Sequence, residues 1–306
     1  MVLVSRCEIA FGESLGTRSH VYNSVMPELP EVETVVRELR ERLPGAVITR
    51  AVLTARDMYR RDSHDVSVLE GARVESVERS GKAIVVRCRS NDGELDLVVH
   101  LGMTGQLLWS ARAKREAPPH LHARWSLSGG AELRLIDPRR FGYVFVAAPE
   151  VVAESLAVGR DALTVTADEL ASLLRGRTAA IKSLLMNQRI LAGLGNIYVD
   201  ESLFLAKVHP LMTGDRATRK SREMANAIRH VLSSAIEARG TTFRDYRRPD
   251  GSSGEFQLRL RVYGREGERC VRCRGRIRRI EVGQRGTHFC PLCQRAPKVV
   301  SSSRRT

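Results

Sequence analysis

The sequence predicts an α+β protein of several domains: an N-terminal β-sandwich domain that begins with a helix, then a helical domain, then a cysteine-rich module. Short strand-like runs joined by turns dominate the first half, helical spacing follows, and two Cys-x-x-Cys pairs come last. The expected segments are an extension (1–25), the β-sandwich domain (26–158), the helical domain (159–255), the cysteine module (256–295) and a disordered tail (296–306).

The charge of the chain indicates a polyanionic partner. The 306 residues are enough for two domains with buried cores, and they carry a net charge of +15 with a pI of about 10.2. Residues 244–306 hold 17 Lys and Arg against 6 Asp and Glu, a net of +11. A general bias toward arginine would not concentrate charge in one segment, so we expect nucleic acid as the partner.

The sequence does not indicate a membrane or an exported protein. No apolar run approaches the roughly 18 residues of a membrane span. The start, Met1 to Cys7, lacks the basic beginning and the long apolar run of a secretory signal. We therefore expect a cytoplasmic location and no membrane partner.

The first predicted helix follows a start without periodicity, residues 1–25. Its apolar residues have helical spacing from Glu31 onward: Val32, Val35, Val36, Leu39 and Leu43. Pro30 suits the first helical position, and Pro44-Gly45 ends the run.

Two hairpins are predicted next. Residues 83–87 and 95–101 flank a turn at 91–93, and a second pair of short runs, 125–127 and 133–135, flanks Gly129-Gly130. Short strands joined by turns favour a β-sandwich or barrel.

From about residue 160 the period becomes helical. Thr166 and Glu169 form a capping-box pattern before a short helix, and further helices are predicted over 181–187, 197–206 and 218–239, the last closed by Gly240. Strand-like alternation returns around Leu258, Leu260 and Val262.

Four cysteines have the spacing of a zinc site, as two Cys-x-x-Cys pairs 16 residues apart: Cys270, Cys273, Cys290 and Cys293. Two disulfides are the alternative, but nothing indicates an oxidising compartment. Four thiolates leave no open coordination position, so we expect one structural Zn²⁺ that stabilises the module and takes no part in catalysis. Arginines between the pairs indicate a finger that grips DNA.

Six motifs, in this order along the chain, resemble those of the bacterial formamidopyrimidine-DNA glycosylase family: Met26-Pro27-Glu28-Leu29-Pro30-Glu31, His100-Leu101-Gly102-Met103-Thr104-Gly105, Asp137-Pro138-Arg139-Arg140-Phe141-Gly142, Gly193-Leu194-Gly195-Asn196-Ile197-Tyr198, Val262-Tyr263-Gly264-Arg265 and the cysteine pairs. Each motif alone is weak, whereas the ordered set is specific. The resemblance implies a helix–two-turn–helix motif in the helical domain, a zinc-finger hairpin, and a monomer. It also implies DNA glycosylase and abasic-site lyase activity on double-stranded DNA that contains oxidised purines or abasic sites.

The resemblance assigns the nucleophile to Pro27 as an amino-terminal secondary amine. Here 26 residues precede Pro27, and the nitrogen of an internal proline is a tertiary amide that cannot attack. We therefore expect translation to begin at Met26 or residues 1–25 to be removed. The alternative is a catalytically inactive protein.

The resemblance assigns three further residues to catalysis. Glu28 resembles the general acid, Lys82 the lysine that binds phosphate and acts in β-elimination, and Arg285 the finger arginine of δ-elimination. The alternatives are a first-turn helix carboxylate for Glu28 and basic surface residues for the other two. Glu31 receives a supporting role only.

The resemblance also implies two groups of DNA contacts. Phosphate contacts are expected from His120, Arg139, Arg177 and Asn196, and Lys182 is expected to add DNA-binding charge nearby. Backbone N–H groups at the glycine-rich turn before Asn196 are expected to form an anion site. Met103, Arg139 and Phe141 resemble the trio that fills the duplex when a lesion is flipped out. Taken without the resemblance, Met103 and Phe141 are predicted to be core residues and His120 a strand histidine facing solvent. The segment 249–256, rich in Gly and Ser, is expected to be a mobile loop that closes over the flipped base.

Two other functions stay open at this stage. One is an endonuclease VIII-like glycosylase for oxidised pyrimidines, whose N-terminus usually has glycine where this chain has Leu29. The other is a non-catalytic binding protein for damaged DNA, if the extension is retained.

Overall fold

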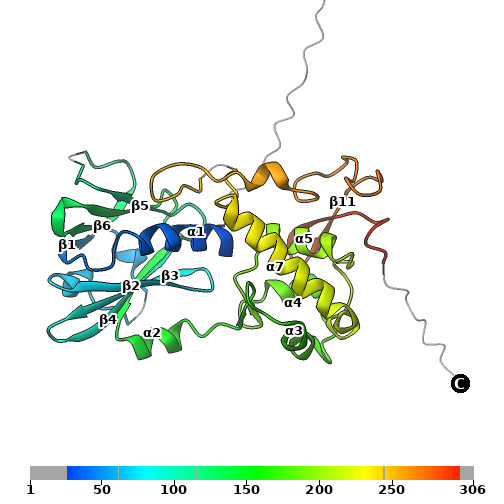
Figure 1. The fold of residues 1–306 in the computed structure, drawn as a ribbon, viewed down its shortest axis with the longest axis horizontal. Helices are drawn as coiled ribbons and strands as arrows, with labels where there is room; N and C mark the ends of the chain where they lie inside the picture. Colours follow the sequence, from blue (N-terminus) through cyan, green and yellow to red (C-terminus); the bar gives the residue numbers. More distant parts are fainter. Residues whose placement is uncertain (1–25, 61, 115, 244, 297–306) are drawn as a thin grey trace, which may run out of the picture.

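The computed structural model describes residues 26–60, 62–114, 116–243 and 245–296. The extension predicted over 1–25, and all but the first residue of the predicted tail, lie outside these residues. Two lobes lie side by side: the sheets form one, and most of the helices and the cysteine-rich hairpin form the other (Figure 1). Within the described ranges no helix is long and apolar enough to cross a bilayer.

The N-terminal lobe is a sandwich of two four-stranded antiparallel sheets. The first has the order β1 (Ile48–Leu53), β6 (Leu121–Leu127), β7 (Glu132–Ile136), β5 (Gln106–Ser110). The second has the order β2 (Arg73–Ser80), β3 (Ala83–Ser90), β4 (Gly93–His100), β8 (Tyr143–Ala147). The β3–β4 and β6–β7 hairpins confirm both predicted hairpins. Alternate residues of both sheets form the core around the buried Trp125.

Helix α1 (Leu29–Arg40) joins the cores of the two lobes. Leu29 packs in the helical core, whereas Val32, Val35, Val36 and Leu39 pack in the sandwich core. The helix begins at Leu29, one residue before the predicted start, and it ends at Arg40. Leu43 stays buried in the turn that follows, because its N–H still bonds to the carbonyl of Leu39.

The helical lobe has a large apolar core, and a smaller apolar cluster around Phe204 and Val262 lies at the cysteine-rich hairpin. The helices of this lobe are α3 (Ala167–Leu174), α4 (Ile181–Met186), α5 (Asn196–Leu205), α6 (Gly214–Ala217) and α7 (Ser221–Glu237), and α2 (Pro149–Ser155) packs beside β4 and β8. The capping box at Thr166 is confirmed. Gly240, with φ of +85°, ends the turn after α7 as predicted. The short strands β9 (Arg160–Asp161) and β10 (Leu191–Ala192) pair in parallel and join the loop before α3 to the loop before α5. The predicted domain limits at 158 and 255 stay predictions.

The strand predicted around Leu258, Leu260 and Val262 is wrong. Residues Phe256–Arg259 form a 3-10 helix, and Leu258 is 82% exposed. The N–H groups of residues 261, 262 and 263 all donate to the carboxylate of Glu201 on α5, at 2.9–3.0 Å. Because a side chain takes up these backbone donors, none remains for a neighbouring strand.

Candidate functional site

The centre of the candidate site is Glu28, directly before α1. Its carboxylate is 2% exposed and accepts hydrogen bonds from the N–H groups of Gly195 (2.7 Å), Ile197 (2.9 Å) and Tyr198 (3.4 Å) at the start of α5. A Cβ on Gly195 would lie 2.4 Å from the Glu28 carboxyl carbon, so this approach requires glycine. The backbone anion site expected here for a phosphate is therefore filled by Glu28, which corrects that expectation.

Glu31, one turn along α1, connects this carboxylate to two other segments. It accepts the hydroxyl of Tyr198 (2.5 Å) and the N–H groups of Thr241 (2.6 Å) and Glu28 (2.9 Å). Burial raises its pKa to about 7, and the Glu28 carboxylate adds to the rise, while the Tyr198 hydroxyl opposes it. Burial also raises the pKa of Glu28, against the opposing charge of Lys82.

Lys82 approaches Glu28 from the other lobe. It lies in the turn between β2 and β3, after Gly81, whose φ is +57°. Burial lowers the pKa of its ammonium group. The carboxylates of Glu28 and Glu31 raise that pKa and the guanidinium of Arg285 lowers it, so all four charges share one site.

Arg285 is held near this site by the finger hairpin, β11 (Arg278–Val282) and β12 (Arg285–Phe289). The carbonyl of Gly286 accepts from Lys182 Nζ (3.2 Å) and Asn196 Nδ2 (3.1 Å). Asp200 on α5 accepts the N–H of His288 at 2.7 Å. These contacts fix the hairpin turn against α4 and α5 and leave the Arg285 side chain exposed.

Lys182 is a correction to the expected DNA contacts. Its side chain is 0% exposed, and its ammonium group pairs with Asp200 at 2.7 Å. A fully buried ion pair cannot contact a phosphate directly, so Lys182 acts on the finger through Gly286.

The sandwich brings four expected DNA contacts together at one end. Strand register places Gln106 and Leu121 opposite Ile136, and His100 opposite Tyr143. The adjoining loops therefore meet and carry the candidates Met103, His120, Arg139 and Phe141.

The surroundings of these side chains test the core and strand positions that were predicted for Met103, Phe141 and His120 without the family resemblance. Phe141 is 53% exposed with the Arg139 guanidinium 4.5 Å from its ring centre, so it is not a core residue. Met103 is partly exposed. His120 lies in a turn with φ of +64°, not on a strand. Arg177 is exposed between α3 and α4, apart from this group, and bonds the carbonyl of Leu173 at 2.7 Å.

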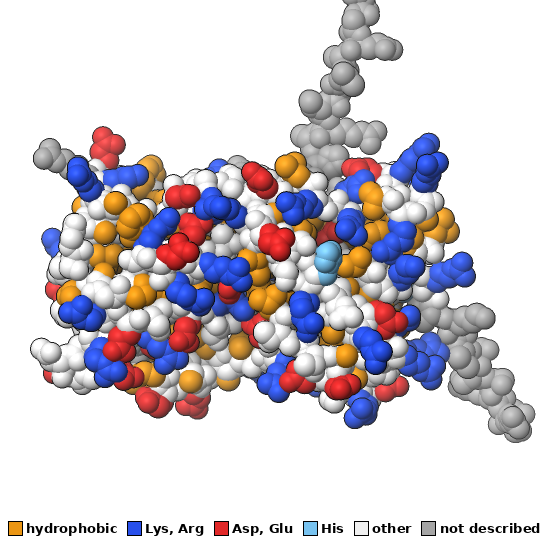
Figure 2. Space-filling view, viewed as in Figure 1, with side chains coloured by type: hydrophobic (Ala, Val, Ile, Leu, Met, Phe, Trp, Pro, Cys, Tyr) orange, Lys and Arg blue, Asp and Glu red, His pale blue; other side chains and the backbone are white. Residues whose placement is uncertain are grey.

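The segment 245–252 overlaps the predicted mobile loop, 249–256, and lies across both lobes. Arg248 pairs with Glu38 of α1 at 2.6 Å, and the carbonyl of Pro249 accepts the N–H of Trp109 on β5 at 2.8 Å. We call this segment the strap. Basic side chains are spread over both lobes of the face shown in Figure 2 and are interspersed with acidic ones, so charge alone does not mark the site.

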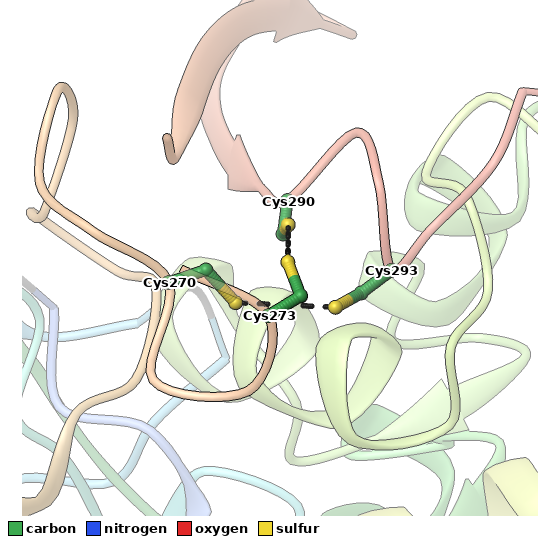
Figure 3. A group of neighbouring side chains, drawn as sticks. All are labelled: Cys270, Cys273, Cys290 and Cys293. Carbon is green, nitrogen blue, oxygen red and sulfur yellow. Dashed lines mark hydrogen bonds between the residues drawn. The ribbon is translucent and has the colours of Figure 1, made fainter. Parts of the chain in front are cut away.

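The four cysteines converge as the spacing predicts (Figure 3). Their Sγ atoms all lie within 4.8 Å of one another, with Cys270–Cys293 at 3.9 Å and Cys273–Cys290 at 3.5 Å, and all four are free thiols. Thiolates about 2.3 Å from a tetrahedral zinc lie about 3.8 Å apart, so the cluster fits a zinc-binding site. The two-disulfide alternative does not fit these distances.

Three buried polar residues of α5 hold the parts of the site together, and none of them was predicted as a site residue from the sequence. Tyr198, Asp200 and Glu201 are buried on α5 and hold Glu31, the hairpin and the segment after the strap. The signal was present, because two adjacent carboxylates interrupt an otherwise apolar helix.

Three family models cover most of the chain. The formamidopyrimidine-DNA glycosylase N-terminal domain matches residues 26–144, the formamidopyrimidine-DNA glycosylase H2TH domain matches 156–247, and a zinc finger found in FPG and IleRS matches 267–296. The chain belongs to the formamidopyrimidine-DNA glycosylase family.

Individual members of the formamidopyrimidine-DNA glycosylase family agree over nearly their whole length. The enzyme so named from Symbiobacterium thermophilum is 42% identical over 288 residues, 92% of this chain and 93% of the relative. The one from Haemophilus ducreyi is 37% identical, over 89% of this chain and 100% of its own.

Solved structures of the family share the fold. The MutM (Fpg) protein of Thermus thermophilus has a TM-score of 0.76 at 38% identity, covering 88% of this chain and 98% of its own. A Lactococcus lactis Fpg mutant in complex with DNA containing Fapy-dG has a TM-score of 0.80 at 33% identity, covering 88% and 100%.

Proposed function

We propose that this chain is a bifunctional DNA glycosylase and abasic-site lyase that excises formamidopyrimidines and 8-oxoguanine from double-stranded DNA. The observation that carries the proposal is the buried Pro27-Glu28 pair, in which the Glu28 carboxylate interacts with the charge of Lys82, and Lys82 in turn with that of the finger arginine Arg285. Family members have been crystallised with DNA containing Fapy-dG, an abasic site or carbocyclic 8-oxo-G, which supports the substrate class.

The first step requires a free amine on Pro27. Its nitrogen attacks C1′ of the deoxyribose, the C1′–N bond to the base breaks, and the base leaves with the bonding electrons. Glu28 supplies a proton for this departure, and its raised pKa favours the protonated form. A peptide bond from Met26 blocks the attack, so the active form begins at Pro27.

The second step begins when the C1′–O4′ bond breaks: O4′ takes the proton released by the Pro27 nitrogen, the sugar ring opens, and an iminium ion is left between Pro27 and C1′. Its positive charge acidifies the C2′ proton. Lys82 takes part in removing that proton, because its lowered pKa makes the neutral amine more available, and the 3′-phosphate leaves. Arg285 clamps phosphate for the second, δ-elimination.

The remaining candidates bind and distort the duplex. Met103, Arg139 and Phe141 enter the gap left by the flipped nucleotide. His120, Arg139 and Arg177 contact phosphates. Asn196 keeps the finger turn beside the lesion. One zinc ion per chain holds the finger, and the protein acts as a monomer.

The test is covalent trapping. The form that begins at Met26 is produced, removal of Met26 is verified by mass, and the protein is incubated with an 8-oxoguanine:cytosine duplex and borohydride. We expect a covalent protein–DNA band. The full 306-residue chain with an intact extension is the matched control, because Pro27 is then acylated and no band should form.

Two alternatives are outcomes of the same assay. A Lactococcus lactis family member has been crystallised with DNA containing an oxidised pyrimidine, so a thymine-glycol duplex is included. Faster excision from that duplex than from 8-oxoguanine would favour the endonuclease VIII-like function. Binding of every lesion duplex without any trapped band, by a form whose mass begins at Pro27, would favour a non-catalytic binding protein.

A further inference from the structure

A single buried carboxylate, Asp137, joins the loops that carry Met103, Arg139 and Phe141. We call these three residues, which are proposed to enter the duplex, the wedge. Asp137 follows β7 directly and is 0% exposed. One carboxylate oxygen, Oδ1, accepts the hydroxyl of Thr104 and the N–H of Arg139 (3.3 Å). The other, Oδ2, accepts the N–H of Gly142 at 2.9 Å. Asp137 thus contacts both the loop of Met103 and the loop of Phe141.

The backbone of Asp137 reaches a third loop. Its N–H donates to the carbonyl of His120 at 3.1 Å, and its carbonyl oxygen lies 3.0 Å from Nε2 of His122. Three segments that are far apart in the sequence, 102–105, 120–122 and 139–142, therefore share one residue as their common contact.

Close backbone packing makes this junction rigid. Gly102 has φ of +61°, and a Cβ there would lie 2.3 Å from the backbone carbon of Phe141. A Cβ on Gly142 would lie 2.5 Å from the carbonyl oxygen of His100. Neither loop has room to shift past the other, so losing the Asp137 contacts affects both.

We propose that Asp137 is a positioning residue that holds Met103, Arg139 and Phe141 in one constellation beside the phosphate contact His120, so that the trio enters the duplex as a unit. The inference rests on the proposed function, because it assigns Asp137 to the wedge of that enzyme. The physical reason is preorganisation: side chains fixed before binding lose less conformational freedom when they fill the gap in the base stack.

The first test measures loop coupling without any activity. Asp137→Asn replaces one accepting oxygen with a donor, so the Thr104–Arg139 side or the Gly142 side loses its acceptor. We expect amide hydrogen exchange to accelerate together in 102–105, 120–122 and 139–142, with exchange in α5 and the finger hairpin unchanged. Unchanged exchange in these loops would overturn the proposal.

The second test separates positioning from general damage. Excision of 8-oxoguanine is compared between a paired duplex and the same lesion in an unpaired bubble, where little stacking has to be replaced. Asp137→Asn is expected to lose about tenfold or more in kcat/KM on the paired duplex relative to the bubble. An equal loss on both substrates would mean that Asp137 only supports the fold, and would overturn the proposal.

Thr104 offers a matched pair that guards against misfolding of the Asp137 variant. Thr104→Val removes the hydroxyl that donates to Asp137 and should reproduce the paired-duplex defect, whereas Thr104→Ser keeps the hydroxyl and should behave as the parent. If Met103→Ala impairs excision from the paired duplex and Thr104→Val does not, the positioning role fails while the enzyme stands. If the parent protein excises no lesion, the proposed function fails, and the exchange measurement still decides whether Asp137 couples the loops.

Discussion

At the scale of single residues, the candidate site places acids and a base where water is scarce. Burial favours the neutral form of each group, so it raises the pKa of Glu28 and Glu31 and lowers that of Lys82. Opposite charges then limit these shifts. The directions of these shifts favour a protonated Glu28 as proton donor and a neutral Lys82 as proton acceptor, which suits the two proposed steps.

Glu31 makes a residue-scale prediction about pH and stability. Its pKa is about 7 in the folded protein against about 4.5 when exposed, so the folded state binds more protons between these values. Its contribution to stability is complete below pH 4.5 and is lost as pH rises through 7. Glu31→Gln should therefore flatten the fall in the free energy of unfolding between pH 5 and pH 7.5, measured by urea denaturation.

The control for this prediction is Glu41→Gln at the exposed end of α1, which should keep the parental slope. Some slope should remain in Glu31→Gln, because the pKa of Glu28 is raised in the same direction. Parallel curves for Glu31→Gln and the parent would contradict the assignment.

At the scale of elements, α5 organises the site. Its N-terminus binds the Glu28 carboxylate, Asp200 holds the finger hairpin, and Glu201 holds the segment that leads into the finger. The helix therefore links the nucleophile end of α1 to Arg285. Its apolar residues alone would predict only a core helix.

The strap gives an element-scale prediction. The pair between Arg248 and Glu38 is largely buried, at 11% and 15% side-chain exposure, and without Arg248 the Glu38 carboxylate keeps Arg42 as an ion-pair partner at 3.5 Å. Arg248→Met should release the strap and speed proteolysis within 249–254 at least several-fold, with little change in the melting temperature. Arg247→Met is the matched control, since Arg247 bonds only the neighbouring carbonyl of Tyr246 among the contacts described. Equal cleavage rates in both variants would show that the ion pair does not hold the strap.

At the scale of the whole molecule, function depends on how two lobes and the finger meet. Lys82 comes from the sandwich, Glu28 from the start of α1, and Arg285 from the finger. No lobe contains the site alone. A zinc ion bound by the four cysteines would act on the site from a distance, because the finger turn contacts Lys182 and Asn196 through Gly286.

Zinc removal is the corresponding prediction. Binding of a structural zinc by four thiolates contributes about 10–16 kcal/mol to folding in small modules, so a metal-free finger should lose its order. Chelation should weaken binding to a lesion duplex by tenfold or more, while far-UV circular dichroism changes little because the lobes keep their own cores. Metal analysis of the untreated protein should find one zinc per chain. Adding zinc after chelation should restore binding to the lesion duplex. Full DNA affinity in a metal-free protein would contradict this dependence.

Much of the architecture and several site residues were predictable from local patterns. Periodicity 2 and 3.6 marks which faces are buried, so the β3–β4 and β6–β7 hairpins, the main helices and the cysteine pairs followed from short stretches of sequence. The exception is the segment at 258–262, which alternates in polarity like a strand. A carboxylate on α5, distant in the sequence, binds N–H groups of this segment, and local pattern cannot predict that contact.

Local pattern and motif order specify the kinds of residue in this protein, its elements and its family, because periodicity and ligand spacing are encoded within a few residues of one another. Packing alone determines the contacts that make a site. Glu28 meets Ile197, Lys182 meets Gly286, and Asp137 meets Thr104, all across long stretches of chain. Such partners depend on how whole sheets and helices close over their cores, and a buried charge such as Lys182 is indistinguishable from an exposed one until that closure is known.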